Sequence, residues 1–186
     1  MNRTLSVERS KAWRNALQYA RKVKILVLDV DGVLTDGKLT FTSSGDELKS
    51  FNAQDGLGMS MLRQCGIEIG LITARISPVV ARRAEELGLI HVYQGCKNKL
   101  TAYEALLKKS GLRPLQTACM GDDWIDLPLL NRAGFAVAPG NGTTELKQRA
   151  HYVTTRQGGN GAVREVCELI MDAQGQYTKM LRHFDR

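Results

Sequence analysis

Apolar residues in this chain gather in short continuous runs that alternate with longer stretches of helical period. Residues 25–29 are branched and apolar up to Asp29, a pattern typical of a parallel strand buried on both faces. Similar short runs predict further strands at 68–72, 91–93, 117–120, 135–138 and 152–154. Apolar residues spaced three and four apart predict helices at 6–22, 56–65, 78–87, 97–109, 125–132, 143–149 and 162–174.

This alternation indicates an α/β fold, a doubly wound, Rossmann-like parallel sheet with helices on both faces and right-handed crossovers. At 186 residues the chain has the length of one domain. We divide it into a basic N-terminal helix in 1–24, a main domain at 25–174, and a tail at 175–186 that shows no clear period. Ser6 is the expected N-cap of the first helix.

The segment 37–52 is not needed for a minimal sheet. Its apolar and polar residues alternate on both sides of a turn at 43–46 that is rich in serine and glycine, which predicts a β-hairpin. We expect this hairpin to be a flap beside the functional edge of the sheet, or an edge that pairs with another subunit.

Polar side chains that can carry chemistry follow the predicted strands or begin the predicted helices. In a doubly wound sheet the loops at the carboxyl ends of the strands share one edge, where ligands bind. Gly32 lets the chain turn away after the first pair of aspartates. The clusters are Asp29 with Asp31, then Thr73, then Lys99, and finally Asp122 with Asp123 and Asp126.

These residue types together suit phosphoryl transfer. Asp29 can attack phosphorus and form an aspartyl-phosphate, and Asp31 can protonate the leaving oxygen and then activate water. Asp29 and Asp122 can hold Mg²⁺, which needs few protein carboxylates and accepts phosphate oxygens. Thr73 and Lys99 can bind the transferring phosphoryl group. Lys97 competes with Lys99 for this role, and either lysine suits a helix surface.

Charge and composition exclude some partners. The formal net charge is +7, but residues 1–24 hold seven basic residues and one acid, so most of the excess lies in the first helix. No interleaved aromatic residues support base stacking there, so we expect a solvated helix and no nucleic-acid partner. No apolar run approaches the roughly 20 residues that span a bilayer, and the N-terminus lacks the apolar core of a secretory signal. We therefore expect a cytoplasmic protein with reduced cysteines and no membrane span.

The ordered clusters resemble the four motifs of the haloacid dehalogenase superfamily phosphatases. The segment 29–36, Asp-Val-Asp-Gly-Val-Leu-Thr-Asp, looks like the first motif, and Thr73, Lys99 and 121–126 match the other three in order. The resemblance implies Mg²⁺ bound by Asp29, Asp122 and the backbone carbonyl of Asp31. It places Asp123 and Asp126 in support of the metal ligands, although either could simply cap the helix that follows.

Three segments, 51–56, 93–100 and 158–167, are similar to the 3-deoxy-D-manno-octulosonate 8-phosphate (KDO 8-phosphate) phosphatase family of lipopolysaccharide biosynthesis. This resemblance implies a Mg²⁺-dependent homotetramer acting on a small sugar phosphate, with the hairpin helping assembly and the C-terminal tail able to reach a neighbour's site. The residues expected to contact substrate are Arg75, Gln54, Asp55, Gly56 and Arg164.

The spacing of the motifs leaves no room for the cap domains that this superfamily inserts between them. Between Asp31 and Thr73 there is space only for the hairpin and one helix. The family pattern is broken at Gln54, Ala74 and Asn160, which bears on the choice of substrate and leaves the chemistry intact. Two alternatives to the expected function are open. One is a phosphatase for another sugar phosphate, such as a nonulosonate 9-phosphate, and the other is a non-catalytic phosphatase-like oligomerisation module.

Overall fold

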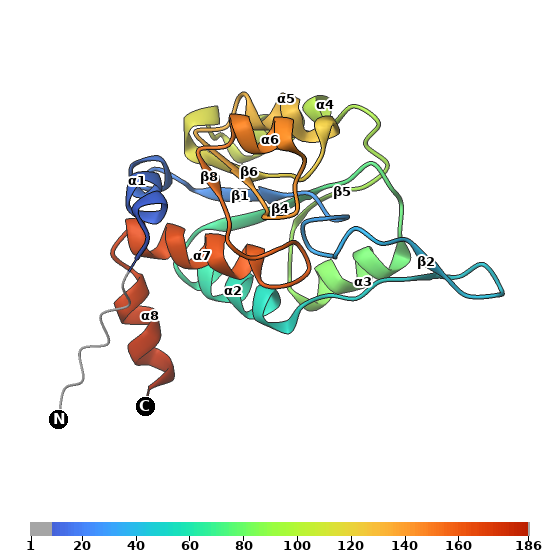
Figure 1. Ribbon diagram of the computed structural model, residues 1–186, viewed down its shortest axis with the longest axis horizontal. Helices are drawn as coiled ribbons and strands as arrows, with labels where there is room; N and C mark the ends of the chain where they lie inside the picture. The colour runs from blue at the N-terminus through green and yellow to red at the C-terminus, as the bar shows by residue number, and fades with distance from the viewer. Residues whose placement is uncertain (1–8, 186) are drawn as a thin grey trace.

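The computed structural model describes residues 9–185 and is built around a parallel sheet of six strands (Figure 1). Their order is β5-β4-β1-β6-β7-β8, so chain order reverses at the central strand β1. This confirms the predicted doubly wound sheet, and such reversals are where α/β proteins bind ligands. The strands are β1 Ile25–Leu28, β4 Glu68–Ile72, β5 His91–Tyr93, β6 Thr117–Met120, β7 Phe135–Ala138 and β8 Tyr152–Val153.

Successive side chains of β1 point to opposite faces and enter two separate hydrophobic cores. Leu26 and Leu28 pack in the core formed with α1 Lys11–Ala20, α2 Ala53–Gln64, α3 Pro78–Glu86 and α7 Ala162–Ala173. Ile25 and Val27 pack in the core formed with α4 Lys99–Ser110, α5 Leu127–Leu130 and α6 Thr144–Arg149. Figure 1 shows these two helical layers on opposite faces of the sheet.

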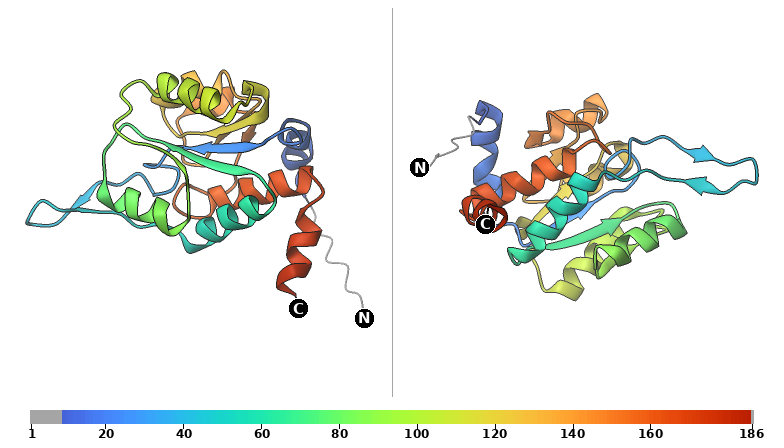
Figure 2. Two further views of the ribbon diagram at one scale, coloured as in Figure 1. Left: turned by 180° about the vertical axis from the view of Figure 1, so that it is seen from behind. Right: turned by 90° about the horizontal axis from the view of Figure 1, so that it is seen from below.

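The predicted hairpin is present and projects from the domain (Figure 2). Strands β2 Thr40–Phe41 and β3 Glu47–Leu48 pair antiparallel with each other and not with the main sheet. Between Asp31 and Thr73 the chain forms only this hairpin, α2 and β4, so there is no cap domain over the sheet edge.

Both ends of the chain differ from the prediction. Helix α1 begins at Lys11 after the N-cap Ser10, whose Oγ accepts a hydrogen bond from the Trp13 amide at 3.1 Å. The predicted start was therefore too early, and Ser6 lies outside the described residues. The tail, for which the sequence analysis found no clear period and predicted no element, forms helix α8 Tyr177–Phe184. Its apolar residues do recur at helical spacing, but over only about two turns after Gly175.

Trp13 fastens α1 to the domain. The residue is 4% exposed, and its ring makes an edge-to-face contact with the ring of Tyr152. Its indole nitrogen donates a hydrogen bond to Asp172 Oδ2 on α7 at 2.8 Å.

We expect Trp13→Ala to lower the free energy of unfolding by about 3–5 kcal/mol, as measured by urea denaturation followed by circular dichroism. Trp124, which is 61% exposed, is the matched control, and its change to alanine should shift stability by less than about 0.5 kcal/mol. Equal losses in the two variants would contradict this role of Trp13.

Candidate active site

A pocket of about 270 Å³ opens at the carboxyl ends of β1, β4 and β6. Every member of the four predicted clusters except Asp126 lines it, and Asp126 is buried just behind it. The lining includes Asp29, Asp31, Thr73, Arg75, Lys99, Asp122 and Asp123. The topology therefore brings together residues that lie nearly one hundred positions apart in the sequence.

The turn after β1 is fitted tightly to its surroundings. The Val30 carbonyl accepts hydrogen bonds from the amides of three following residues, which turns the chain at once. Gly32 has a φ of +90°, and a Cβ there would lie 2.0 Å from Asp122 Oδ2. Gly158 meets the same turn, since a Cβ on it would lie 1.8 Å from the Gly32 carbonyl oxygen. Asn141 joins the two glycines, accepting from the Gly158 amide at 2.7 Å and donating to the Gly32 carbonyl at 3.4 Å.

Lys99 is the cation at the centre of the site. Its side chain is 1% exposed, and its Nζ lies 2.6 Å from Asp29 Oδ1 and 2.7 Å from Asp126 Oδ1. Asn98 caps helix α4 immediately before it, which points the Lys99 side chain from the first residue of the helix. Lys97 is exposed and does not line the pocket, so the geometry favours Lys99 over its competitor.

Asp126 supports its neighbours from behind. Its Oδ1 accepts from Lys99, and its Oδ2 accepts from the backbone amides of Asp122 and Asp123 at 3.2 and 3.5 Å. Asp123 is exposed and caps the short 3₁₀ helix Trp124–Asp126, accepting from the Trp124 amide at 2.7 Å. Asp126 thus orients the loop that carries Asp122, while Asp123 shapes its surface.

Burial and neighbouring carboxylates raise the pKa values of Asp29 and Asp122. Burial raises the pKa of Asp29 to about 7, the nearby Asp126 adds to the rise, and Lys99 opposes it. Burial also raises the pKa of Asp122 to about 6, with the charges of Asp126 and Asp123 adding to it. For Lys99, burial disfavours the charged form, but the attraction of Asp29 and Asp126 prevails and raises its pKa. One ammonium therefore leaves this group of carboxylates short of positive charge.

A divalent cation fits this donor set. Oxygens of Asp29, Asp122 and Asp126 lie within 4.8 Å of one another, and hard oxygen ligands are those that Mg²⁺ prefers. Because both Asp126 oxygens already accept hydrogen bonds, Asp29 and Asp122 are the two carboxylates placed to hold an ion. The side chain of Asp31 is directed elsewhere and bonds to Lys49.

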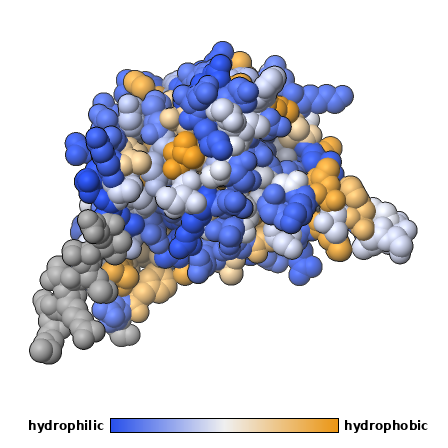
Figure 3. Space-filling view, viewed as in Figure 1, coloured by the Kyte–Doolittle hydropathy of each residue, from blue (hydrophilic) through white to orange (hydrophobic). Residues whose placement is uncertain are grey.

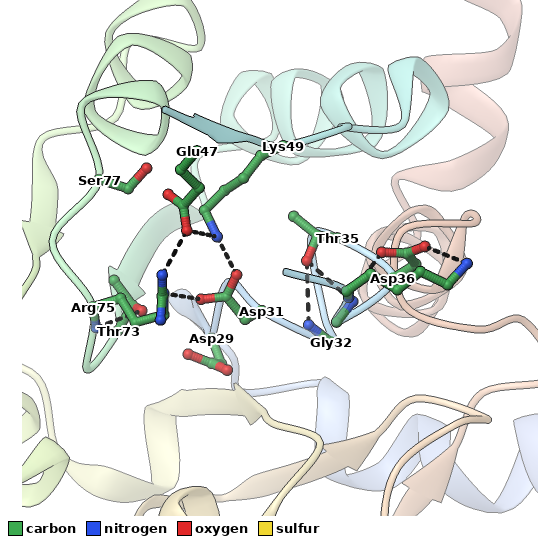
Figure 4. A network of polar contacts seen from close by, with 12 residues as sticks. Asp29, Asp31, Gly32, Thr35, Asp36, Glu47, Lys49, Thr73, Arg75 and Ser77 are labelled. Atoms are coloured by element: carbon green, nitrogen blue, oxygen red, sulfur yellow. Dashed lines mark hydrogen bonds and ion pairs between the residues drawn. The ribbon is translucent and has the colours of Figure 1, made fainter. Parts of the chain in front are cut away.

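Two hairpin residues that the sequence analysis did not select reach the site. Lys49 Nζ donates to Asp31 Oδ1 and lies 3.2 Å from Glu47 Oε1 (Figure 4). Arg75 Nη2 donates to the same Glu47 oxygen at 2.8 Å. Although burial alone would raise it, the pKa of Glu47 falls to about 2 because Ser77, Arg75 and Lys49 surround its carboxylate. The i, i+2 spacing of Glu47 and Lys49 places both side chains on one side of the extended chain. This spacing is the sequence feature that could have indicated that the two residues act together.

Thr73 directly follows β4 and lines the pocket. It is 2% exposed, and its Oγ1 accepts a hydrogen bond from the Arg75 amide at 3.3 Å. Arg75 is the one predicted substrate-contact residue that lines the pocket, with its guanidinium extending toward Glu47 and Asp31.

The other predicted substrate contacts lie along α2 and α7, outside this pocket lining. Asp55 accepts from the Gly161 amide at 3.2 Å and from the Arg164 amide at 2.7 Å, so it caps the start of α7. Gln54 accepts from Arg156 at 3.0 Å, and the Arg164 side chain pairs with Glu168 on its own helix at 2.7 Å. Gly56 is packed against Arg83, whose Nη2 would lie 2.3 Å from an added Cβ. A substrate role for Gln54, Asp55, Gly56 and Arg164 stays a prediction.

The sheet and its aspartate site define a class of hydrolases. Residues 72–166 match the family described as haloacid dehalogenase-like hydrolase. The chain is 45% identical over 157 residues to the 3-deoxy-D-manno-octulosonate 8-phosphate phosphatase of Salmonella typhi, covering 84% of each chain.

Solved structures of KDO 8-phosphate phosphatases have the same fold as this chain. The structure of the Yersinia pestis KDO 8-phosphate phosphatase is 42% identical with a TM-score of 0.87, covering 88% of this chain and 89% of that one. The Moraxella catarrhalis enzyme, in complex with magnesium, phosphate and KDO, is 45% identical with a TM-score of 0.89, covering 91% and 97%. The chain therefore belongs to the haloacid dehalogenase-like hydrolases, in the family of KDO 8-phosphate phosphatases.

Binding of Mg²⁺ to Asp29 and Asp122 should stabilise the fold. At ten times its Kd the ion should add about 1.4 kcal/mol, and the melting temperature should rise by roughly 3–6 °C. Asp122→Asn should abolish this shift in differential scanning fluorimetry, whereas Asp123→Asn should keep most of it. A Mg²⁺ shift that survives Asp122→Asn would show that the ion binds elsewhere.

Proposed function

We propose that this chain is a Mg²⁺-dependent phosphoric monoester hydrolase that converts KDO 8-phosphate to KDO and inorganic phosphate in lipopolysaccharide biosynthesis. The observation that carries the proposal is the buried Asp29 carboxylate, which faces the open pocket between Lys99 and Asp122. The relatives' shared name and the KDO and phosphate bound by the Moraxella catarrhalis enzyme support the choice of substrate.

The residues divide the reaction between them. Asp29 attacks phosphorus and becomes an aspartyl-phosphate, while Asp31 gives a proton to the departing sugar oxygen. Asp31 then takes a proton from the water that hydrolyses the intermediate and frees Asp29. Lys99 and Thr73 hold the phosphoryl oxygens and offset their charge. Asp29, Asp122 and the Asp31 backbone carbonyl would hold Mg²⁺, which would further neutralise that charge.

We also propose a homotetramer working in the cytoplasm. The uncapped pocket is open to solvent, and the neighbouring hairpin carries three exposed apolar residues, Leu39, Phe41 and Leu48. Figure 3 shows apolar surface on this projection. An exposed apolar projection of this kind suits contact with a second subunit. Among residues 9–185, none of the helices is long and apolar enough to cross a membrane.

A related sugar-acid phosphate is the second candidate substrate. Gln54 stands where the family resemblance expects arginine, and its side chain is engaged by Arg156. Glutamine in place of arginine removes a positive charge near the start of α2, and the aspartates of the pocket are unchanged. The chemistry would be the same, and only the sugar would differ.

Asp29→Asn tests the mechanism. Without a carboxylate nucleophile, Mg²⁺-dependent phosphate release should fall by at least about 10³-fold while the circular dichroism spectrum is kept. Asp36→Asn, which removes an exposed carboxylate seven residues further along, should retain activity. Near-normal turnover by Asp29→Asn would exclude the aspartyl-phosphate route.

A panel of sugar phosphates tests the substrate. We expect kcat/KM for KDO 8-phosphate to exceed that for nonulosonate 9-phosphates and for simple hexose phosphates by about tenfold or more. Preference for a nonulosonate 9-phosphate would replace the first candidate with the second. The absence of phosphate release from every member would favour the non-catalytic module.

A further inference from the structure

Four charged side chains form a closed ring beside the pocket (Figure 4). Lys49 bonds to Asp31 and lies 3.2 Å from Glu47, Glu47 accepts from Arg75 at 2.8 Å, and Arg75 Nε lies 3.9 Å from Asp31 Oδ2. Glu47 and Lys49 come from the hairpin, Asp31 from the turn after β1, and Arg75 from the segment after β4. The ring carries two positive and two negative charges, so it is balanced without an ion or a substrate.

Lys49 is the deepest member of this ring. Its side chain is 1% exposed, against 42% for Arg75, and a buried ammonium is costly unless it is paired. By contrast, Lys38 on the same hairpin is 81% exposed and pairs only with its near neighbour Asp36. A lysine that merely kept the hairpin soluble would resemble Lys38. Because Lys49 is buried against Asp31, we infer that it serves the site and not only the solubility of the hairpin.

The contact with Lys49 bears on the orientation of Asp31. Asp31 lies in a turn rather than in a strand or helix, so the backbone alone leaves its short side chain several rotamers. Lys49 holds one oxygen by a hydrogen bond, whereas the other keeps only the 3.9 Å contact with Arg75. Arg75 in turn is held more closely by Glu47. One carboxylate oxygen is thus fixed and the second stays available for proton exchange.

We propose that Lys49 is a positioning residue that holds the Asp31 carboxylate for proton transfer to the leaving oxygen, with Glu47 keeping Lys49 in place. The hairpin is then part of the active site of its own subunit. This inference rests on the proposed function, in which Asp31 protonates the departing alkoxide. An aspartate that is displaced by about 1 Å transfers its proton far less effectively, and such misplacement can cost about 100-fold in rate.

Leaving-group dependence separates positioning from mere structural support. The value of kcat/KM reports the steps up to release of the leaving group. A sugar alkoxide needs a proton to depart, whereas p-nitrophenolate leaves without one, so only the first reaction depends on a well-placed Asp31. We expect Lys49→Met to lower kcat/KM by about 10–100-fold for KDO 8-phosphate but by less than about threefold for p-nitrophenyl phosphate.

Matched variants sharpen the comparison. Lys38→Met, the same change at the exposed lysine of the same hairpin, should leave both values unchanged. Lys49→Arg keeps the charge and should recover part of the loss on the sugar phosphate. Glu47→Gln leaves the pair of Lys49 and Asp31 intact, so it should have a smaller effect than Lys49→Met although it also breaks the ring.

Equal losses on both substrates in Lys49→Met would show that Lys49 only secures the hairpin and would overturn the inference. Unchanged activity of Lys49→Met would also overturn it. If Lys49→Met does not fold, Lys49→Arg decides instead: its remaining loss in kcat/KM should be larger for KDO 8-phosphate than for p-nitrophenyl phosphate, and equal losses on the two substrates would overturn the inference. Failure of the proposed function is seen separately, because the wild-type enzyme would then release no phosphate from KDO 8-phosphate. If the wild type hydrolyses another alkyl phosphate, that compound serves in its place.

Discussion

The structure depends on the balance of charge at the carboxyl end of β1, where one buried ammonium meets three carboxylates. Lys99 lies between Asp29 and Asp126, and Asp122 completes the group. Such a cluster would be unfavourable in a buried place unless each charge had partners at close range. The partners come from β1, from the start of α4 and from the segment after β6. The strand order that places these three segments side by side is therefore a condition for the chemistry as well as for the core.

The same requirement explains the close packing around the first turn. Gly32 leaves space for the Asp122 carboxylate, and Gly158 leaves space for the carbonyl of Gly32. Three segments far apart in sequence meet here with less room than a methyl group would need. Asp29 thus lies directly before a tightly packed turn, while side chains from the hairpin and from the segment after β4 lie beside it at the pocket. The absence of a cap leaves these side chains as the walls of the pocket.

Much of this could be predicted from the sequence, because strands buried on both faces leave continuous apolar runs. The aspartates, Thr73 and Lys99 follow strand ends or begin helices, so their convergence also follows from the topology. The ring of Lys49 and Glu47 could not be predicted in this way, because the direction in which a projecting hairpin folds back depends on tertiary contacts.

Contacts between residues far apart in the sequence could not be predicted either, because they also depend on the tertiary structure. Asp55 caps a helix that begins more than one hundred residues later, a contact that no local sequence pattern indicates. The start of α1 was missed because Ser6 and Ser10 are equally good caps by residue type, and burial of Trp13 against α7 favours the later start. The helix α8 is only eight residues long, so its period is a weak signal.

The hairpin projects away from the two hydrophobic cores (Figure 2). None of residues 37–50 belongs to either hydrophobic core, so the fold energy of the domain does not rest on them. Asp29 and its charge partners Lys99 and Asp126 are buried at the carboxyl edge of the sheet, where a change disturbs packing. Mutations in the hairpin can therefore accumulate at little cost to folding while they alter the environment of the departing group. In this architecture the choice of alcohol can change through the hairpin while Asp29, Lys99 and Asp122 keep their arrangement on the domain.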